Sequence, residues 1–363
     1  MKVLLCTPYN PGPLCEQGGI VIWAKNIMDY YSTTACDVSV RVVPFNRRIR
    51  DNRKLYKRIW GGMADYWPAI KETSREVKNG YDVLHLCTSA QISLIKDYFV
   101  LKAAKRRGVK TVVHFHFGRM SELIEQKNWE WKLMRRVLNL ANEIVLMDLK
   151  SFNALKDLGF GNIHYLPNPL SLAIMNQVGQ EADAIARKEN RITFVGHVIP
   201  DKGVYELVEA CKAINGIELH IIGICREEVA EKMRKIAGAG DWLCLDGQME
   251  HRKVINELLS SSIFVLPSYT EGFPNVILES MVCSCAIVST SVGAIPEMLA
   301  IRTPEPCGIC CEPKDVEGLR DGIRFFIENS EEARKYSERA KKRVKEMYAV
   351  DKVWDKLTAI WRG

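Results

Sequence analysis

The chain has 363 residues, of which 47% are hydrophobic and 26% are charged. This length exceeds what one hydrophobic core usually supports, so we expect two domains, and the composition excludes a disordered protein. No stretch approaches the roughly 18 apolar residues of a membrane-spanning helix, and the apolar run after Met1 is too short for a signal peptide. We therefore expect a cytoplasmic protein.

Positive charge is concentrated in the first half. Residues 1–170 hold 26 Lys and Arg against 15 Asp and Glu, a net of +11, and the remaining residues hold 25 against 29, a net of −4. Seven cations fall between Arg47 and Arg58, followed by Trp60 and Trp67. Nucleic acid or anionic lipid could bind such a segment, and a solvated helix face is the alternative. We expect an anionic membrane at Arg47–Arg58, on the inner leaflet, and no nucleic acid.

Short apolar runs in the first half predict buried strands, separated by helical patterns. The strands are Val3–Cys6, Val38–Val43, Val83–Cys87, Thr111–Phe117, Ile144–Met147 and Ile163–Leu166, and the helical patterns include Ile20–Tyr31, Gln91–Arg107 and Ser121–Ala141. His114 and His116 alternate along the fourth strand, which we take to point them to opposite faces, so that only one lines a cleft.

The second half repeats the scheme, and its expected strands are Ile192–Val195, Leu219–Ile222, Trp242–Leu245, Ile263–Leu266, Ala286–Ser289 and Gly308–Cys311. Alternating strands and helices predict an α/β protein with two doubly wound parallel sheets, each Rossmann-like. The domain boundary is expected between Pro169 and Arg191, because Ser171–Asn190 lacks a clear strand and is polar at its end. The domains are expected at residues 1–169 and 170–348, with their ligand cleft facing the carboxyl ends of the strands.

Two glutamates bracket a strand, turn and helix start in the run Glu271–Glu279. Pro274 suits the first turn of a helix, so Glu271 lies in the loop and Glu279 about a turn further along the helix. Two carboxylates roughly 10 Å apart can accept hydroxyl donors from both ends of a sugar nucleotide. The phosphates would face the N–H groups of the helix N-terminus. The alternative is two ordinary surface glutamates.

Gly18 and Gly19 follow the first strand and precede a helical run. Residues without side chains let backbone N–H groups approach a phosphate at a helix N-terminus, although any tight turn would use the same pair. The twelve cysteines are scattered, and the one CxxC, Cys307–Cys310, has no second pair nearby. Reduced structural thiols are therefore expected.

Several pieces resemble the retaining glycosyltransferases of family 4, also called glycosyl transferases group 1. The specific ones are Val265–Pro274, Glu279–Met281, Ala286–Thr290 and Val292–Glu297. Weaker ones stand in the same order: Gly18-Gly19, His114–His116, Pro167–Pro169, Phe194–Gly196 with Lys202-Gly203, and Leu219–Gly223. The resemblance covers essentially the whole chain. It implies the GT-B architecture and a last helix, residues 349–363, that returns to the first domain and docks through Trp354 and Trp361.

The resemblance also assigns roles to residues. Glu271, Lys202 and His116 would be catalytic, with Lys202 meeting the pyrophosphate and His116 near the anomeric carbon. Donor contacts would come from Gly18, Gly19, His197, Gly272, Phe273, Pro274, Asn275, Val276 and Glu279, and Arg119 would meet an anionic acceptor. The family commonly has arginine at His197 and glycine at Ser284. The first departure removes a fixed charge, and the second can alter a local turn.

The expected reaction is transfer of a hexosyl unit from a nucleotide diphosphate sugar, with UDP-sugar favoured, to a saccharide or lipid-linked saccharide in cell-surface polysaccharide synthesis. Retention is implied by the resemblance alone. No Asp-x-Asp pair occurs, so no metal and no cofactor are expected. The alternatives are a small soluble acceptor, a sugar-nucleotide epimerase or a non-catalytic sugar-nucleotide-binding protein. An NAD-dependent oxidoreductase is disfavoured, because no G-x-G-x-x-G follows the first strand.

Overall fold

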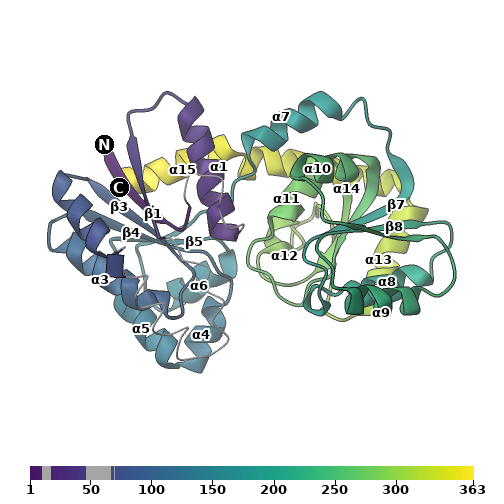
Figure 1. The fold of residues 1–363 in the computed structure, drawn as a ribbon, viewed down its shortest axis with the longest axis horizontal. Coiled ribbons are helices and arrows are strands. Elements are labelled where there is room, and N and C mark those ends of the chain that lie inside the picture. Colours follow the sequence, from purple (N-terminus) through teal and green to yellow (C-terminus); the bar gives the residue numbers. More distant parts are fainter. Residues whose placement is uncertain (10–17, 46–66, 69) are drawn as a thin grey trace. The chain divides into compact units, whose positions relative to one another are not determined.

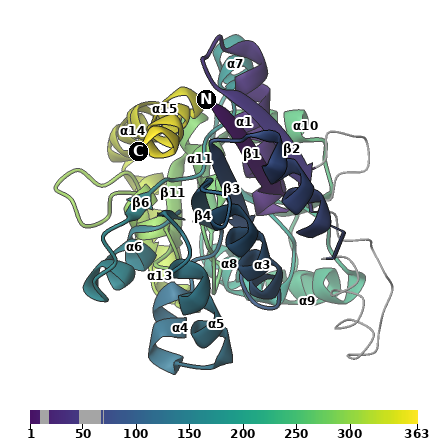
Figure 2. The same cartoon turned by 90° about the vertical axis from the view of Figure 1, so that its left-hand side faces the viewer.

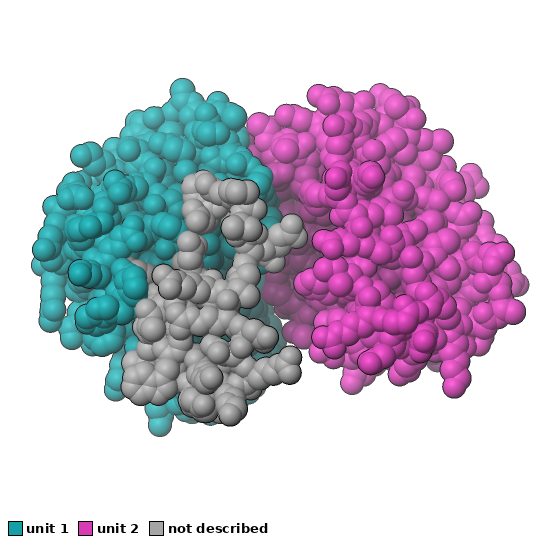
Figure 3. Space-filling model, viewed as in Figure 1, with its two compact units in different colours: residues 1–169, 353–363 teal, residues 170–352 magenta. Residues whose placement is uncertain are grey.

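The structure is a computed structural model, and it describes residues 1–9, 18–45, 67–68 and 70–363. The basic segment Arg47–Arg58 and Trp60, for which the sequence predicts membrane contact, lie outside the described residues. The chain divides into two compact units (Figure 3). Unit 1 comprises Met1–Pro169 and Val353–Gly363, and unit 2 comprises Leu170–Lys352. The chain returns from unit 2 to unit 1 between Lys352 and Val353, inside the last helix. This boundary lies a few residues beyond residue 349, the expected start of the segment that returns to the first domain.

Unit 1 is built on six parallel strands in the order β2-β1-β3-β4-β5-β6 (Figure 1). The strands are β1 (Lys2–Thr7), β2 (Ser39–Pro44), β3 (Val83–Thr88), β4 (Lys110–Phe115), β5 (Glu143–Leu146) and β6 (Ile163–Tyr165). The helices with described bounds are α1 (Gly19–Thr33), η1 (Val77–Asn79), α3 (Ser93–Lys105), α4 (Met120–Gln126), α5 (Trp129–Leu138), α6 (Leu149–Asp157) and α15 (Val350–Arg362).

Unit 2 has a second sheet of six parallel strands, in the order β12-β11-β10-β7-β8-β9. They are β7 (Lys188–Val195), β8 (Glu218–Ile222), β9 (Leu243–Gly247), β10 (Ser261–Leu266), β11 (Ala286–Thr290) and β12 (Ile309–Cys311). The helices are α7 (Leu172–Glu181), η2 (Pro200–Lys202), α8 (Val204–Lys212), α9 (Glu227–Ala237), α10 (His251–Ser260), α11 (Asn275–Val282), α12 (Ile295–Met298), α13 (Val316–Glu328), α14 (Ser330–Arg343) and η3 (Val344–Tyr348). The predicted pair of doubly wound parallel sheets is confirmed.

The two faces of the first sheet are covered by different helices. Leu84 and Leu86 on β3 point to a hydrophobic core that also contains buried residues of α3 and α5. Their neighbour His85 points the other way, where Trp23 of α1 and Trp361 of α15 contact its ring. This period-two alternation is what a strand covered on both sides requires.

The predicted helix Ser121–Ala141 is wrong as a single element, because the structure divides it into α4 and α5. Lys127 ends α4 with a left-handed φ of 48°, and its N–H donates to the Leu123 carbonyl. The side chain of Asn128 then accepts from the N–H of Trp131 and caps α5. Asn is among the preferred N-cap residues. Asn128 is therefore a signal in the sequence for a new helix start inside the longer helical pattern.

The last turns of α15 are anchored on unit 1 by polar contacts. The indole N–H of Trp361 donates to Nδ1 of His85 at 2.9 Å. Lys110 donates to the carbonyl of Ile360 at 2.8 Å, and Arg362 forms an ion pair with Asp37 at 2.6 Å. The ring of Trp354 lies against those of Tyr30 and Tyr31 of α1. These contacts explain why Val353–Gly363 belongs to unit 1.

The buried residues His85 and His114 and the partly exposed His116 gather around Trp23. The rings of His114 and His116 are 3.8 Å apart, so the prediction that they point to opposite faces is wrong: residues two apart on a strand share a face. Among the described residues, no donor or acceptor faces either ring nitrogen of His114 or His116. Burial lowers the pKa of His85 and of His116 to about 3, and that of His114 well below its ordinary value.

Ser284 stands in a left-handed turn between α11 and β11, with φ of 59°. The backbone thus has a conformation that suits glycine, the residue that the family resemblance implies here, and serine is strained in it. Arg187 holds this turn, because its guanidinium donates to the carbonyls of Ser261, Cys283 and Ser284 at 2.6–2.8 Å.

Among the described helices, none combines the length and the apolar character needed to cross a bilayer.

The histidine cluster should make stability depend on pH. Each of the three histidines has a folded pKa below its unfolded value of about 6.5, so the unfolded chain binds more protons between the two values. The contribution of the neutral histidines to the free energy of unfolding is fully present above about pH 6.5 and is lost as the pH drops toward 3. Between pH 7 and pH 5 each buried ring should cost on the order of 2 kcal/mol. Denaturant unfolding of wild type and His114→Phe at both pH values measures this, and an equal loss in both proteins would contradict it.

Replacing Ser284 by glycine should stabilise the protein. The left-handed conformation costs a non-glycine residue about 1–2 kcal/mol, and the extra backbone entropy of glycine takes back about 0.4–1 kcal/mol. The expected gain is the difference of these two terms, up to about 1.6 kcal/mol in the free energy of unfolding, measured with denaturant. Ser284→Ala should give no gain, and a loss of stability in Ser284→Gly would contradict the steric account.

Candidate functional site

In each sheet the direction of strand addition reverses once, and the loops at that point diverge. In unit 1 the reversal lies between β1 and β3, and in unit 2 it lies between β10 and β7. Ligands of open parallel sheets bind at the carboxyl ends of the strands at such a point. Gly18 and Gly19 follow β1, Lys202 follows β7, and Glu271 follows β10.

Lys202 and Glu271 meet at the reversal point of unit 2. The ammonium Nζ lies 2.6 Å from Oε1 of Glu271, and the hydroxyl of Ser268 donates to the same oxygen at 2.7 Å. Both side chains are mostly shielded from solvent, with 25% and 12% of their surface exposed. Among the described residues none donates to Oε2, so this carboxylate keeps one oxygen for a ligand donor.

Glycines bring the backbone segments of the pair together. Gly203 has φ of 69°, and a Cβ there would lie 2.1 Å from the Pro267 carbonyl oxygen, so only glycine lets η2 approach the end of β10. Gly293 has φ of 56°, and a Cβ there would lie 2.3 Å from the Glu271 carbonyl oxygen. The N–H of Tyr269 also donates to the Asp201 carbonyl at 2.9 Å. These contacts fix the loops that carry Lys202 and Glu271.

Glu279 lies on α11, one turn beyond the helix start, as expected. Its Oε1 is 3.1 Å from Nε2 of His251, the first residue of α10, and its side chain is 12% exposed. Pro274 is the N-cap, so α11 begins at Asn275 and presents its first N–H groups toward the Glu271 loop. Phe273 is buried and its ring contacts that of Tyr348, so its side chain belongs to the core.

The remaining donor residues predicted in unit 2 lie beside the same loops. Gly272 accepts from the N–H of Ala294 through its carbonyl, and Asn275 and Val276 are partly exposed in the first turn of α11. His197 is exposed two residues after the end of β7. Gly223 at the end of β8 approaches Gly196 so closely that a Cβ would lie 1.8 Å from its carbonyl oxygen.

The predicted site residues of unit 1 differ in how accessible they are to a ligand. Gly18 is the N-cap of α1, and a Cβ on either Gly18 or Gly19 would meet no described heavy atom within 4 Å. His116 is enclosed by Trp23 and His114, with both ring nitrogens shielded. Arg119 is not free: both oxygens of Glu130 accept from its guanidinium, at 2.6 and 3.1 Å.

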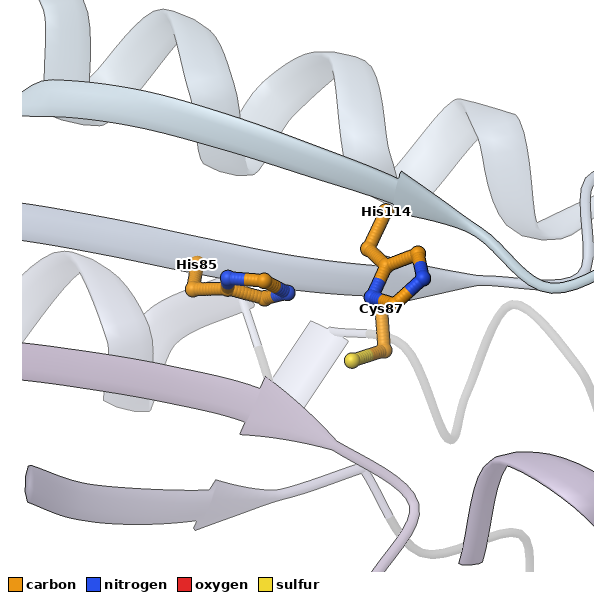
Figure 4. A group of neighbouring side chains, drawn as sticks. All are labelled: His85, Cys87 and His114. Carbon is orange, nitrogen blue, oxygen red and sulfur yellow. The ribbon is translucent and has the colours of Figure 1, made fainter. Parts of the chain in front are cut away.

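His85, Cys87 and His114 bring three potential metal ligands within 4.8 Å of one another (Figure 4). Because the indole N–H of Trp361 donates to Nδ1 of His85, the proton of this neutral ring is assigned to Nε2. A metal ligand needs a free lone pair, and a nitrogen that carries a proton has none. Burial also holds the pKa of the Cys87 thiol well above its usual range. These residues do not fit a metal while Trp361 is in place.

Three residues that contact predicted site residues within their own unit are not predicted by the sequence. Ser268 stands within Val265–Pro274, and its hydroxyl orients Glu271. His251 is separated from Glu279 by a helix and a strand, and no spacing predicts their contact. Glu130 falls within the predicted helical pattern Ser121–Ala141, and it accepts from both Arg119 and the N–H of Gln91.

Known proteins are similar to this chain in sequence and in fold. Residues 179–343, which lie in unit 2, match the model of the family described as glycosyl transferases group 1. The capsular polysaccharide biosynthesis glycosyltransferase CapM of Staphylococcus aureus is 23% identical over 234 residues, 61% of this chain and 59% of that protein. The alpha-maltose-1-phosphate synthase of Mycolicibacterium smegmatis is 27% identical over 188 residues, 47% of each. The chain thus spans about half the length of the curated relatives it matches.

Solved structures share the fold over nearly the whole chain. Sucrose-phosphate synthase from Thermosynechococcus elongatus superposes with a TM-score of 0.76 at 16% identity, over 99% of this chain and 98% of its own. The Anabaena protein HepE in complex with UDP gives 0.71 at 15% identity, over 99% of both chains. Residues 179–343 are thus similar to the glycosyl transferases group 1, and the chain as a whole has the GT-B fold that the solved glycosyltransferases share.

Proposed function

We propose that the protein transfers a hexosyl unit from a UDP-sugar to a saccharide acceptor, with retention at the anomeric carbon and without a metal ion. The acceptor we favour is a lipid-linked saccharide of cell-surface polysaccharide synthesis, reached at the inner leaflet of an anionic membrane. CapM is named for capsular polysaccharide biosynthesis, and HepE was solved with UDP, which supports both the process and the nucleotide.

The observation that carries the proposal is the pair formed by Lys202 and Glu271 at the strand reversal of unit 2. An ammonium beside the N-terminus of α11 is suited to a diphosphate, because both favour negative charge. A diphosphate can replace Glu271 as the partner of Lys202, which frees the carboxylate to accept a sugar hydroxyl. In this proposal Glu279, one turn along α11, accepts from the ribose.

In the proposed reaction the acceptor oxygen bonds to the anomeric carbon as the bond from that carbon to the phosphate oxygen breaks. The departing phosphate oxygen takes the acceptor proton. Lys202 stabilises the negative charge that develops on the diphosphate. In metal-dependent transferases a bound metal ion has this role. Gly18 and Gly19 add backbone N–H groups, and exposed His197 adds charge only when protonated.

His116 is assigned to the hexose near the anomeric carbon. With its pKa lowered to about 3 by burial, its ring is neutral and offers one N–H and one lone pair to sugar hydroxyls. Both nitrogens are shielded in this structure, so the ring has to turn away from His114 to reach a sugar. Arg119 contributes to acceptor binding only if an anion competes with Glu130.

UDP should raise the melting temperature of the protein and NAD should not, because a ligand that binds only the folded state stabilises it. At a hundredfold excess over Kd the gain is about 2.7 kcal/mol, roughly 5–10 °C for a unit of this size. The shift should persist in EDTA. A shift with NAD alone would overturn the enzyme class, GDP in place of UDP would change only the base, and loss of activity in EDTA restored by Mn²⁺ would refute the metal-free mechanism.

Lys202→Ala and Glu271→Ala should each lower turnover at least about tenfold, or roughly 1.4 kcal/mol of transition-state stabilisation. Glu279→Ala should mainly raise the Kd for UDP, since the ribose is remote from the bond that breaks. Release of UDP from the sugar nucleotide in the presence of acceptor is the measurement. Arg234→Ala, which removes an exposed ion pair on α9, is the matched control. Wild-type kinetics in all three site variants would refute the site.

A further inference from the structure

An exposed surface of unit 1 combines apolar and cationic side chains on α3 and α5. Its apolar members are Ile92, Ile95, Phe99 and Trp129, of which Phe99 is 51% and Trp129 58% exposed. Its cations are Lys105, Arg106 and Arg107 at the end of α3, and Lys132, Arg135 and Arg136 on α5. All six are exposed. We call this surface the α3–α5 face.

The solvent side of α3 is apolar where a surface helix is usually polar. Ile92, Ile95 and Phe99 recur at the spacing of one helix face. The opposite face buries Leu94, Leu101 and Ala104 in the core under the sheet. A helix that is apolar on both sides normally has a partner on its second side. Phe99 is 51% exposed, although the ring of Tyr98 contacts it.

α5 extends this surface in the same direction. Trp131, Met134 and Val137 belong to the same core as the inner side of α3, so both helices cover one face of the sheet and turn their outer sides away from it (Figures 1 and 2). Trp129, Lys132 and Arg136 stand at helix spacing on the outer side. Oε1 of Glu130 accepts from the N–H of Gln91, which ties the starts of the two helices together.

The charge of the α3–α5 face has one sign. The carboxylates carried by the two helices are Asp97 and Glu130, which are both buried and paired with Lys96 and Arg119. Among the described residues, no carboxylate pairs with any of the six cations, and the next exposed ones are Glu122 and Glu125 on neighbouring α4. Apolar side chains at helix starts and cations at helix ends suit a surface with an apolar interior and anionic headgroups.

We propose that the α3–α5 face docks the protein on an anionic lipid bilayer, with Ile95, Phe99 and Trp129 entering the interface and the cations contacting lipid phosphates. Ile92 and Trp129 lie where α3 and α5 begin, at the carboxyl-end edge of the sheet, and Glu130 links that edge to Arg119. Docking there would bring a lipid-linked acceptor to the loop that follows β4. This last step rests on the proposed function, whereas docking itself is measured without it.

The test is co-sedimentation of the full chain with vesicles of phosphatidylglycerol and phosphatidylcholine, and with phosphatidylcholine alone. Wild type should bind only the anionic vesicles and should be released at 1 M salt, where screening shortens the range of attraction to about 3 Å. The variant Lys132→Gln, Arg135→Gln, Arg136→Gln should lower the partition coefficient at least about tenfold. Phe99→Ser with Trp129→Ser should lower it comparably.

The control variants carry the same kinds of change elsewhere on the protein. Lys212→Gln, Lys235→Gln, Lys345→Gln removes three exposed lysines from unit 2, and Leu158→Ser removes an exposed apolar residue of unit 1. Both should bind vesicles like wild type. Circular dichroism and the melting temperature should match wild type in every variant, since all the replaced side chains are exposed.

Several results would overturn the proposal. Binding that the control variants weaken as much as the α3–α5 variants would make it a general charge effect. A dimer in sedimentation velocity that Phe99→Ser with Trp129→Ser dissociates, without vesicle binding by wild type, would assign the face to a second copy. The UDP-induced shift in melting temperature, measured on the same variants, separates docking from the proposed function. Vesicle binding without that shift would support docking and refute the proposed function. The shift without vesicle binding would support the proposed function and refute docking.

Discussion

A parallel sheet brings the carboxyl ends of all its strands to one edge, and a reversal of strand order opens a gap between two loops at that edge. The candidate site of unit 2 depends on this constraint. β7 and β10 are neighbours in the sheet although more than sixty residues separate them, and Lys202 meets Glu271 because each follows one of these strands. Gly203 and Gly293 then allow the backbones to close on the pair at distances that a side chain would prevent.

The strands and their parallel arrangement could be predicted from the sequence because a strand covered on both faces is a short continuous apolar run. Glu271 and Glu279 could be predicted for a similar reason, since their spacing along one helix start is local. The contacts of Ser268 with Glu271 and of His251 with Glu279 could not be foreseen in this way. Which loop lies against which is decided by strand order, and strand order leaves no mark in local sequence.

The errors have equally physical causes. The helix predicted over 121–141 carried apolar periodicity through Lys127 and Asn128, but the capping amide of Asn128 competes for the next N–H and starts a new helix. The opposite orientation expected of His114 and His116 misapplied the period of a strand. Their shared face makes His116 part of a buried aromatic cluster, so its environment is set by Trp23 and His85 as well as by any substrate.

Glu130 occupies an unusual position in the network of unit 1. One carboxylate holds the guanidinium of Arg119 and the backbone N–H at the start of α3, and it follows directly after Trp129. Removing it would leave a half-buried arginine unpaired and loosen the start of α3 at the same time. An alanine scan would therefore record a single defect at Glu130 that mixes the proposed acceptor contact of Arg119 with the proposed docking of the α3–α5 face, and only changes on either side of Glu130 can tell the two apart.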